Sequence, residues 1–242
     1  MKLLFACAAV AVGLIAPAIA RADTPVPADS APPAETAAEA PLDIEFTLDA
    51  VSDYRFRGVS LSDRRPALQP GVTLTHRSGL YASAWASTLA EDAGPDVEVD
   101  LVAGYARPLG PVTLDLGAAW YLYPGDRGAD YLELTSRVST AVGPAEAGLT
   151  VAWAPKQRNL DNLSNRYAAL DVSVPLPRTP LTLSGSFGIE DGALGDRKRD
   201  WSLGLSGEVA GFALGASYVD TARAGAGRLG RAGVVLSAGR SF

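Results

Sequence analysis

The sequence predicts an all-β fold, a transmembrane antiparallel up-and-down β-barrel of about 12 strands. In its last twelve residues, which end in Phe242, small or apolar side chains alternate with polar ones. Eleven earlier segments repeat this two-residue period, and turns separate them. The chain also begins with a segment typical of exported proteins. Such a series of alternating strands in an exported chain is typical of outer-membrane barrels.

Residues 1–22 form the predicted signal peptide. Lys2 supplies a positive start, residues 3–15 an apolar core, and the small residues around 18–22 a cleavage site. Cys7, the one cysteine of the chain, is removed with this segment. Disulfides, thiolate catalysis and cysteine metal sites are therefore excluded from the mature protein.

Residues 23–41 are rich in Pro, Ala and acidic side chains and have no apolar period, which predicts a disordered periplasmic arm. The remaining residues, 42–242, are enough for one outer-membrane barrel domain. Removal of the leader leaves 19 basic and 27 acidic residues, a formal charge of −8. This balance argues against nucleic acid as a partner.

The first strand is expected over residues 44–57. Ile44, Phe46 and Leu48 share one parity, and Glu45 and Asp49 share the other. The alternation continues to Arg57, and about 9 to 11 residues suffice to cross a bilayer as a tilted strand. The later strands are expected at 68–77, 80–90, 96–107, 112–123, 131–142, 146–154, 167–176, 181–190, 200–209, 212–220 and 231–242.

Connections of two lengths alternate along the chain. The short ones are predicted at 78–79, 108–111, 143–145, 177–180 and 210–211. The longer and more polar ones are predicted at 58–67, 91–95, 124–130, 155–166, 191–199 and 221–230. Short periplasmic turns opposite long extracellular loops are the outer-membrane pattern.

Aromatic side chains gather near the expected strand ends, which predicts two interfacial rings. The ring at the short turns comprises Phe46, Tyr81, Tyr105, Phe212 and Phe242. The ring at the long loops comprises Tyr54, Phe56, Trp120, Tyr123, Tyr131, Trp153, Tyr167, Phe187, Trp201 and Tyr218.

The segment Ser52-Asp-Tyr-Arg-Phe-Arg-Gly58, together with Ser78-Gly-Leu-Tyr-Ala-Ser-Ala-Trp85, resembles the TorF-type family of porin-like proteins. The similarity is densest over residues 50–90. It implies a proteobacterial outer-membrane pore of unassigned substrate. The family has no agreed catalytic residues, so none is carried over.

Charged side chains on the inward parity are predicted to line the pore, because charges facing lipid are costly. The set comprises Glu45, Asp49, Asp53, Arg55, Arg57, Glu98, Asp100, Asp115, Glu133, Arg137, Asp171, Glu190 and Glu208. Acids predominate in it, which favours a water-filled channel for small hydrophilic solutes with a preference for cations. The alternative is a plugged, non-conducting barrel with a structural, adhesive or lipid-packing role, in which Asp53 pairs with Arg55 or Arg57 and Glu133 with Arg137.

Asp53, Arg55 and Arg57 are expected near the outer mouth, either as a constriction that contacts solutes or as a salt-bridge cluster. The barrel's partners are expected to be outer-membrane lipid and lipopolysaccharide, which the basic run 197–199 could contact, and small solutes or ions. Phe242 resembles the terminal signal that the barrel assembly machinery recognises. The sequence leaves the oligomeric state open.

An enzyme is not expected. The one histidine, His76, precedes a short turn, whereas a rim hydrolase would need a positioned base at the loop end. The sequence also predicts no metal site and no cofactor, because this single histidine has no cysteine partners in the mature chain.

Overall fold

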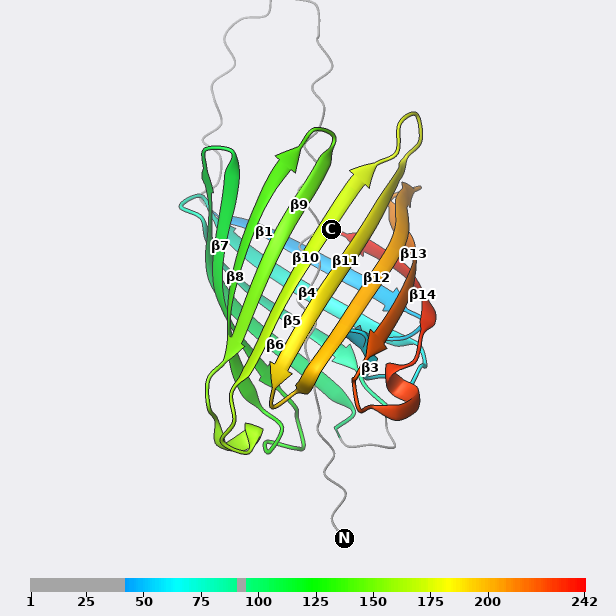
Figure 1. Cartoon of the computed structure of the whole chain (residues 1–242). Helices are drawn as coiled ribbons and strands as arrows, with labels where there is room; N and C mark the ends of the chain where they lie inside the picture. Colours follow the sequence, from blue (N-terminus) through cyan, green and yellow to red (C-terminus); the bar gives the residue numbers. More distant parts are fainter. Residues whose placement is uncertain (1–41, 91–94) are drawn as a thin grey trace, which may run out of the picture.

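The computed structural model describes residues 42–90 and 95–242, in which twelve strands form one closed antiparallel barrel (Figure 1). Each barrel strand pairs with the next along the chain, and β1 closes the ring against β14. The predicted class and strand number are confirmed. The predicted signal peptide and arm, 1–22 and 23–41, lie outside the described residues. The barrel strands are β1 (Leu42–Val51), β4 (Ala67–His76), β5 (Leu80–Thr88), β6 (Val97–Leu109), β7 (Val112–Leu122), β8 (Tyr131–Val142), β9 (Ala145–Ala154), β10 (Asn165–Pro175), β11 (Leu181–Gly192), β12 (Gly195–Val209), β13 (Phe212–Ala222) and β14 (Gly233–Ser241).

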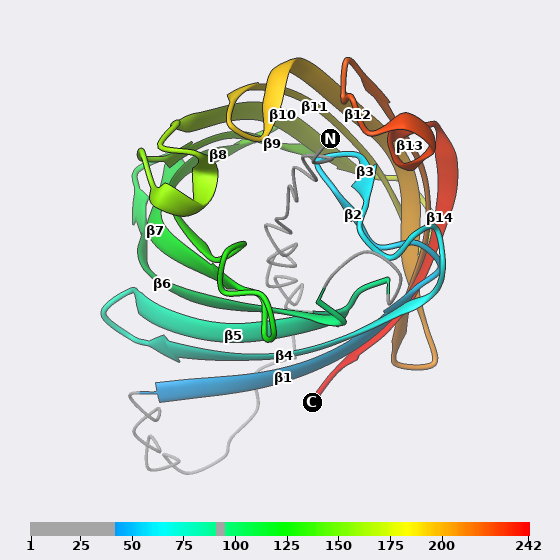
Figure 2. The same ribbon diagram turned by 90° about the horizontal axis from the view of Figure 1, so that it is seen from below.

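The first strand is shorter than predicted, because it ends at Val51 rather than at Arg57. The chain then folds into a small hairpin of β2 (Arg55–Phe56) and β3 (Val59–Ser60), which lies inside the ring of strands (Figure 2). The turn residues Arg57 and Gly58 have φ values of 42° and 83°. Positive φ at both central positions is the type I′ geometry of tight hairpins. A Cβ on Gly58 would lie 2.2 Å from the Cγ2 atom of Thr221, so only glycine fits there.

The connection from β11 to β12 is also shorter than predicted. A loop was expected over 191–199, but β12 already begins at Gly195. Gly192 has a φ of 131°, and a Cβ there would lie 2.2 Å from the carbonyl oxygen of Ser164. Glycine at this position permits the sharp turn, so the charged residues that follow belong to a strand and alternate between its two faces.

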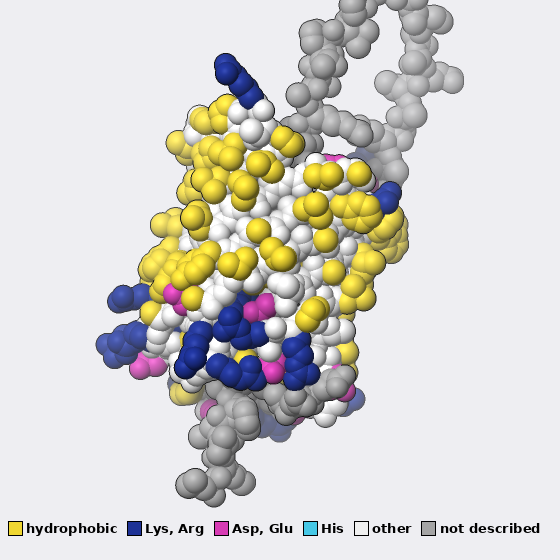
Figure 3. Space-filling view, turned by 90° about the vertical axis from the view of Figure 1, so that its right-hand side faces the viewer, with side chains coloured by type: hydrophobic (Ala, Val, Ile, Leu, Met, Phe, Trp, Pro, Cys, Tyr) yellow, Lys and Arg dark blue, Asp and Glu magenta, His cyan; other side chains and the backbone are white. Residues whose placement is uncertain are grey.

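The outer face of the barrel is apolar. Leu101, Leu149, Leu170 and Leu203 are between 42% and 60% exposed on four different strands. In the space-filling view, hydrophobic side chains cover the middle of the surface, and Lys and Arg gather at the long-loop end (Figure 3). An apolar band flanked by polar ends is the surface that a membrane-spanning barrel presents to lipid.

None of the helical turns in the described part of the chain is long or apolar enough to cross a membrane. These turns are η1 (Arg158–Leu160) and η2 (Gly227–Gly230), and both lie in long loops.

The predicted aromatic ring at the long loops consists of two different sets. Trp120, Trp153, Phe187 and Tyr218 are 44% to 52% exposed and face outward, as expected for interfacial side chains. The assignment of the other set to the outer ring is wrong. Tyr54, Phe56, Tyr123 and Tyr131 are at most 3% exposed and belong, with Tyr121, to the interior. Their position follows from the hairpin, which supplies apolar surface inside the barrel for these rings to cover.

The two ends of the barrel sheet meet at Phe242. Its backbone N–H donates to the carbonyl oxygen of Phe46 at 2.9 Å, and the N–H of Phe46 donates back at 3.3 Å. The terminal residue therefore extends the pairing of β1 with β14 beyond the strand that ends at Ser241.

Candidate functional site in the barrel lumen

The inward-folded hairpin is held by its own polar side chains. Asp53 accepts hydrogen bonds from Ser60 Oγ at 2.5 Å and from Arg55 Nε at 2.7 Å. Ser62 Oγ accepts a hydrogen bond from the Tyr54 N–H at 2.9 Å. The expected pairing of Asp53 with one of the two arginines is therefore confirmed for Arg55. We call residues 53–62, the wall side chains that they contact and the buried wall side chains next to these the hairpin layer.

Arg57 joins the hairpin to three wall strands. Its Nη2 lies 2.7 Å from Glu133 Oε2 on β8, and its Nη1 pairs with Glu190 on β11. Lys198 on β12 pairs with Glu190 at 2.5 Å and also donates to the backbone oxygen of Arg57 at 3.1 Å. All four side chains are at most 3% exposed, so this is a buried ionic network. Buried networks of this kind hold elements in one arrangement, because breaking them leaves a buried charge without a partner.

The expected pair of Glu133 with Arg137 is wrong. Arg137 instead donates to Asp171 on β10, at 2.5 Å and 2.8 Å from its two terminal nitrogens. Arg137 lies four residues further along β8, closer to the short turn that follows Val142, whereas Glu133 contacts Arg57. The inserted hairpin therefore changes which residue neutralises Glu133.

Tyrosine hydroxyls connect the hairpin to the acidic side of the wall. Tyr54 and Tyr123 each donate to a different oxygen of Glu98, both at 2.9 Å. The ring of Tyr167 lies under the Arg57 guanidinium, 4.0 Å from its centroid, and its hydroxyl donates to Asp200 at 3.0 Å. Cation–π contact and hydrogen bonds thus fix the hairpin on both sides.

The half of the lumen near the short turns is more open, and we call it the vestibule. Asp171 and Arg137 both face inward from the middle of their strands, yet their side chains are 36% and 32% exposed. Tyr81 donates to Asp115 at 2.8 Å, and Asp115 is partly buried. Inward side chains that remain exposed indicate that water reaches this half of the barrel.

The structure divides the predicted pore-lining residues between these two zones. The hairpin layer contains Asp53, Arg55, Arg57, Glu98, Asp100, Glu133 and Glu190. The vestibule contains Glu45, Asp49, Asp115, Arg137, Asp171 and Glu208. The structure therefore brings together two groups at different depths, and the pore-lining role of both stays a prediction.

Several interior polar residues escaped the sequence analysis. Lys198 was expected in an exposed basic loop with Arg197 and Arg199, but it is 1% exposed inside the barrel. Asn165, which donates to Glu190 at 2.9 Å, and Asp200 are interior as well. The signal was present: Lys198 and Asp200 share the inward parity of Gly204 and Glu208, and extending that strand backwards would have found them.

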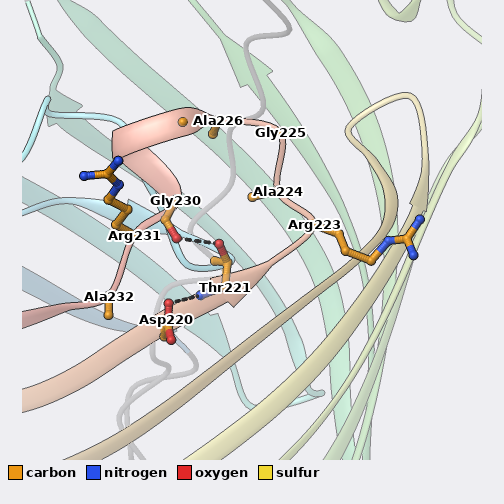
Figure 4. Close-up of a pocket in the computed structure, with 10 residues that line it drawn as sticks. Asp220, Thr221, Arg223, Ala224, Gly225, Ala226, Gly230, Arg231 and Ala232 are labelled. Atoms are coloured by element: carbon orange, nitrogen blue, oxygen red, sulfur yellow. Dashed lines mark hydrogen bonds between the residues drawn. The ribbon is translucent and has the colours of Figure 1, made fainter.

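The long loop between β13 and β14 supports the hairpin from outside. Its shallow surface pocket lies between the end of β13 and η2, where Thr221 Oγ1 donates to the Gly230 oxygen at 2.6 Å (Figure 4). Arg223 and Arg231 line this pocket and point away from each other (Figure 4). The backbone oxygen of Arg231 accepts a hydrogen bond from Arg55 Nη1 at 2.8 Å, which ties the loop to the hairpin.

His76 contacts a serine, but in the manner of a turn. Its Nδ1 lies 2.8 Å from Ser78 Oγ and 3.2 Å from the Ser78 backbone nitrogen. Because a backbone N–H can only donate a hydrogen bond, His76 Nδ1 is the acceptor. This contact stabilises the turn at the short-turn end. In the ranges 42–90 and 95–242, no group of three or more His, Cys, Asp or Glu side chains is placed to hold a metal ion.

A family model described as "Bacterial protein of unknown function (Gcw_chp)" matches residues 35–234. The chain belongs to this family. The match does not confirm the TorF-type resemblance. No curated protein matches the chain.

Solved structures with a similar fold are outer-membrane channels. A KdgM porin is matched with a TM-score of 0.56 and 8% identity, over 82% of this chain and 97% of that one. A NanC porin is matched with a TM-score of 0.56 and 14% identity, over 79% and 97%. An outer-membrane channel from Pseudomonas putida F1 is matched with a TM-score of 0.51 and 10% identity, over 88% and 100%. At these identities the likeness shows the fold, that of an outer-membrane porin barrel.

Proposed function

We propose that this protein is an outer-membrane channel for passive diffusion of small hydrophilic solutes, with the hairpin layer as its constriction. The observation that carries the proposal is the solvent-exposed, inward-facing Asp171 in the middle of a closed porin-type barrel. The barrel has no free edges and its outer face is apolar, so water inside it is separated from lipid by the sheet. The path open to this water runs along the barrel axis. The porin folds that the chain resembles support this proposal.

The vestibule gives the proposed channel a preference for cations. It contains the five carboxylates Glu45, Asp49, Asp115, Asp171 and Glu208. Arg137 is the basic residue that pairs with one of them, Asp171. Carboxylates along a narrow aqueous path raise the local concentration of cations and exclude anions.

The lipid partners follow from the outer surface. Arg166 and Arg199 are exposed on the outward parity of β10 and β12, at the long-loop edge of the apolar band. Guanidinium groups at this level suit the phosphates of lipopolysaccharide. Export by a cleaved signal peptide and insertion by the barrel assembly machinery complete the proposed location in the outer membrane.

A second candidate function is a non-conducting barrel. The observation in its favour is the buried pairing of Arg57 with Glu133 and Glu190, which fixes the hairpin across the lumen. A closed layer would leave the barrel a structural or lipid-packing role.

Planar-bilayer conductance separates the two functions. The full chain is expressed with its leader, purified from outer membranes and placed in a salt gradient. Discrete current steps with a cation-directed reversal potential are expected. A correctly folded, heat-modifiable barrel that gives no steps would favour the non-conducting barrel.

A further inference from the structure

The hairpin layer contains more buried acids than bases. Asp53, Glu98, Asp100, Glu133, Glu190 and Asp200 are each at most 6% exposed. The bases that meet them are Arg55, which pairs with Asp53, and Arg57 and Lys198, which meet Glu133 and Glu190. In the described part of the chain, Glu98 and Asp100 form no ion pair with a basic side chain. Asp200 forms no ion pair there either, but it accepts a hydrogen bond from Tyr167 and lies two residues from Lys198 on the inward face of β12. The two neighbours on β6, Glu98 and Asp100, have no basic residue on their own strand face.

Of these two carboxylates, Asp100 is the one without hydrogen-bond partners in the part of the chain that the structure describes. It is 2% exposed, and neither of its carboxylate oxygens has a hydrogen-bond partner within the described residues. Both oxygens of Glu98 accept hydrogen bonds from tyrosine hydroxyls. An ionised carboxylate buried without a partner is costly, so Asp100 requires a positive charge from outside the chain or a proton.

Aromatic rings surround this carboxylate. Asp100 lies opposite Trp85 of β5 on one side and opposite Tyr121 of β7 on the other, so the three side chains form an inward row across three strands. Tyr54 of the hairpin packs edge-on against Trp85, with ring centroids 5.4 Å apart. Trp85 is only partly buried and shares the inward face of Asp100. A carboxylate with aromatic side chains beside it on both neighbouring strands is the chemistry that binds ammonium groups.

A metal ion fits these groups less well. Calcium takes six to eight oxygen ligands and magnesium six, whereas Asp100 supplies two free oxygens and the described residues hold no larger ligand group. An ammonium group needs few acceptors and gains from the aromatic faces.

We propose that Asp100, with Trp85 and Tyr121, binds the ammonium group of a small amine inside the lumen. This proposal rests on the proposed channel function and names small organic cations as its solute class. The binding step itself does not require conduction. An amine that enters from the vestibule reaches the accessible part of Trp85 and then pairs with Asp100 under Tyr54.

The test uses Trp85 as its own reporter. Trp120 and Trp153 are exposed on the outer face, and Trp201 lies opposite the exposed Phe187, so it shares that face. In the full chain carrying Trp120→Phe, Trp153→Phe and Trp201→Phe, Trp85 is the remaining tryptophan. Methylammonium chloride is titrated against sodium chloride at constant ionic strength, with the protein in detergent. A saturable change in Trp85 emission is expected.

Substitution identifies the carboxylate. Asp100→Asn preserves shape and should weaken methylammonium binding by about tenfold or more, the value of one hydrogen bond to a charged group. Asp196→Asn, which changes an 80% exposed carboxylate outside the lumen, is the matched control and should leave the affinity unchanged. Asp100→Ser serves as a second variant if the asparagine variant does not reach the heat-modifiable state.

Three results would overturn the site. Equal affinity in the Asp100 variants would mean that the amine binds elsewhere. A saturable response to calcium chloride alone would replace the ammonium class by a metal ion, and no response to either salt would mean that a proton compensates Asp100. If the fluorescence response persists while the barrel gives no current in bilayers, the channel function fails and the binding site stands.

Discussion

Arg57 and Glu133, 76 positions apart in the chain, are joined across the barrel interior by a 2.7 Å contact between Nη2 and Oε2. The arginine belongs to the inserted hairpin and the glutamate to the wall. This ion pair is one of the contacts that fix the hairpin across the lumen.

Replacing Arg57 should widen the proposed constriction. Arg57→Gln leaves Glu133 and Glu190 buried without their shared partner, a change that typically costs about 3 to 5 kcal/mol. The hairpin should leave the wall and single-channel conductance should rise, measured in planar bilayers. Arg197→Gln, which alters an exposed charge near the start of β12, is the control. An unchanged conductance in a folded Arg57→Gln barrel would show that the hairpin does not limit flow.

Neutralising the vestibule should reduce the preference for cations. Asp115→Asn combined with Asp171→Asn removes two carboxylates and leaves Arg137 without its partner. The ratio of cation to anion permeability, obtained from the reversal potential, should fall on the order of twofold or more. Asp196→Asn, an exposed residue at the start of β12, is the matched control. Equal reversal potentials for both variants would place the selectivity elsewhere.

Acid should loosen the loop above the hairpin. Asp63 accepts a hydrogen bond from Arg228, which lowers the pKa of the Asp63 carboxyl below its ordinary value. A pKa lowered in the folded state contributes stability above its ordinary value, and that stability is lost as the pH falls below about 4 and through the lowered value. Residues 227–230 should exchange amide hydrogens faster at acid pH, after correction for the intrinsic rate. Asp63→Asn should show the faster exchange already at pH 7. A pH response that survives in Asp63→Asn would exclude this carboxylate as its source.

Deleting Phe242 should impair insertion but not export. The deletion removes two backbone hydrogen bonds to Phe46 at the seam, together with the terminal aromatic that resembles an assembly signal. The amount of heat-modifiable barrel in the outer membrane should fall while leader cleavage continues. Phe242→Tyr keeps both features and should insert normally. Normal amounts of the deleted form would contradict the prediction.

The two-residue periodicity was sufficient to predict the strands of the barrel but not the hairpin inside it. The strand 131–142 was predicted with its observed bounds because no charged residue interrupts its outward parity and its inward parity holds Glu133 and Arg137. The same rule failed at Ser52, because Tyr54 and Phe56 keep the outward parity while the chain has already turned inward. Apolar side chains of the hairpin pack against other side chains inside the barrel, whereas those of a barrel strand face lipid. Both produce the same alternation in the sequence. The turn at Arg57 and Gly58 was the signal that could have separated the two.

The interior ion pairs could not be predicted for a related reason. Inward parity identified Glu133, Arg137 and Asp171 correctly as facing one side of the sheet, but pairing depends on depth and on what lies in the lumen. Once the hairpin supplies Arg57 to Glu133, Arg137 pairs with Asp171 instead. A pattern along one strand contains no information about a segment inserted from another.

The seam between β1 and β14 has a consequence for how the molecule folds. Every other barrel pairing joins strands that follow each other in the chain, so it can form as a local hairpin. The seam is the one pairing that must bring together the two extremes of the sheet, and such a loop closure is the slow, entropically costly step. Until residues near Thr47 meet those near Ser241, two unpaired edges face the bilayer. Maturation of this barrel should therefore have one late kinetic phase, set by seam closure and sensitive to changes at either edge.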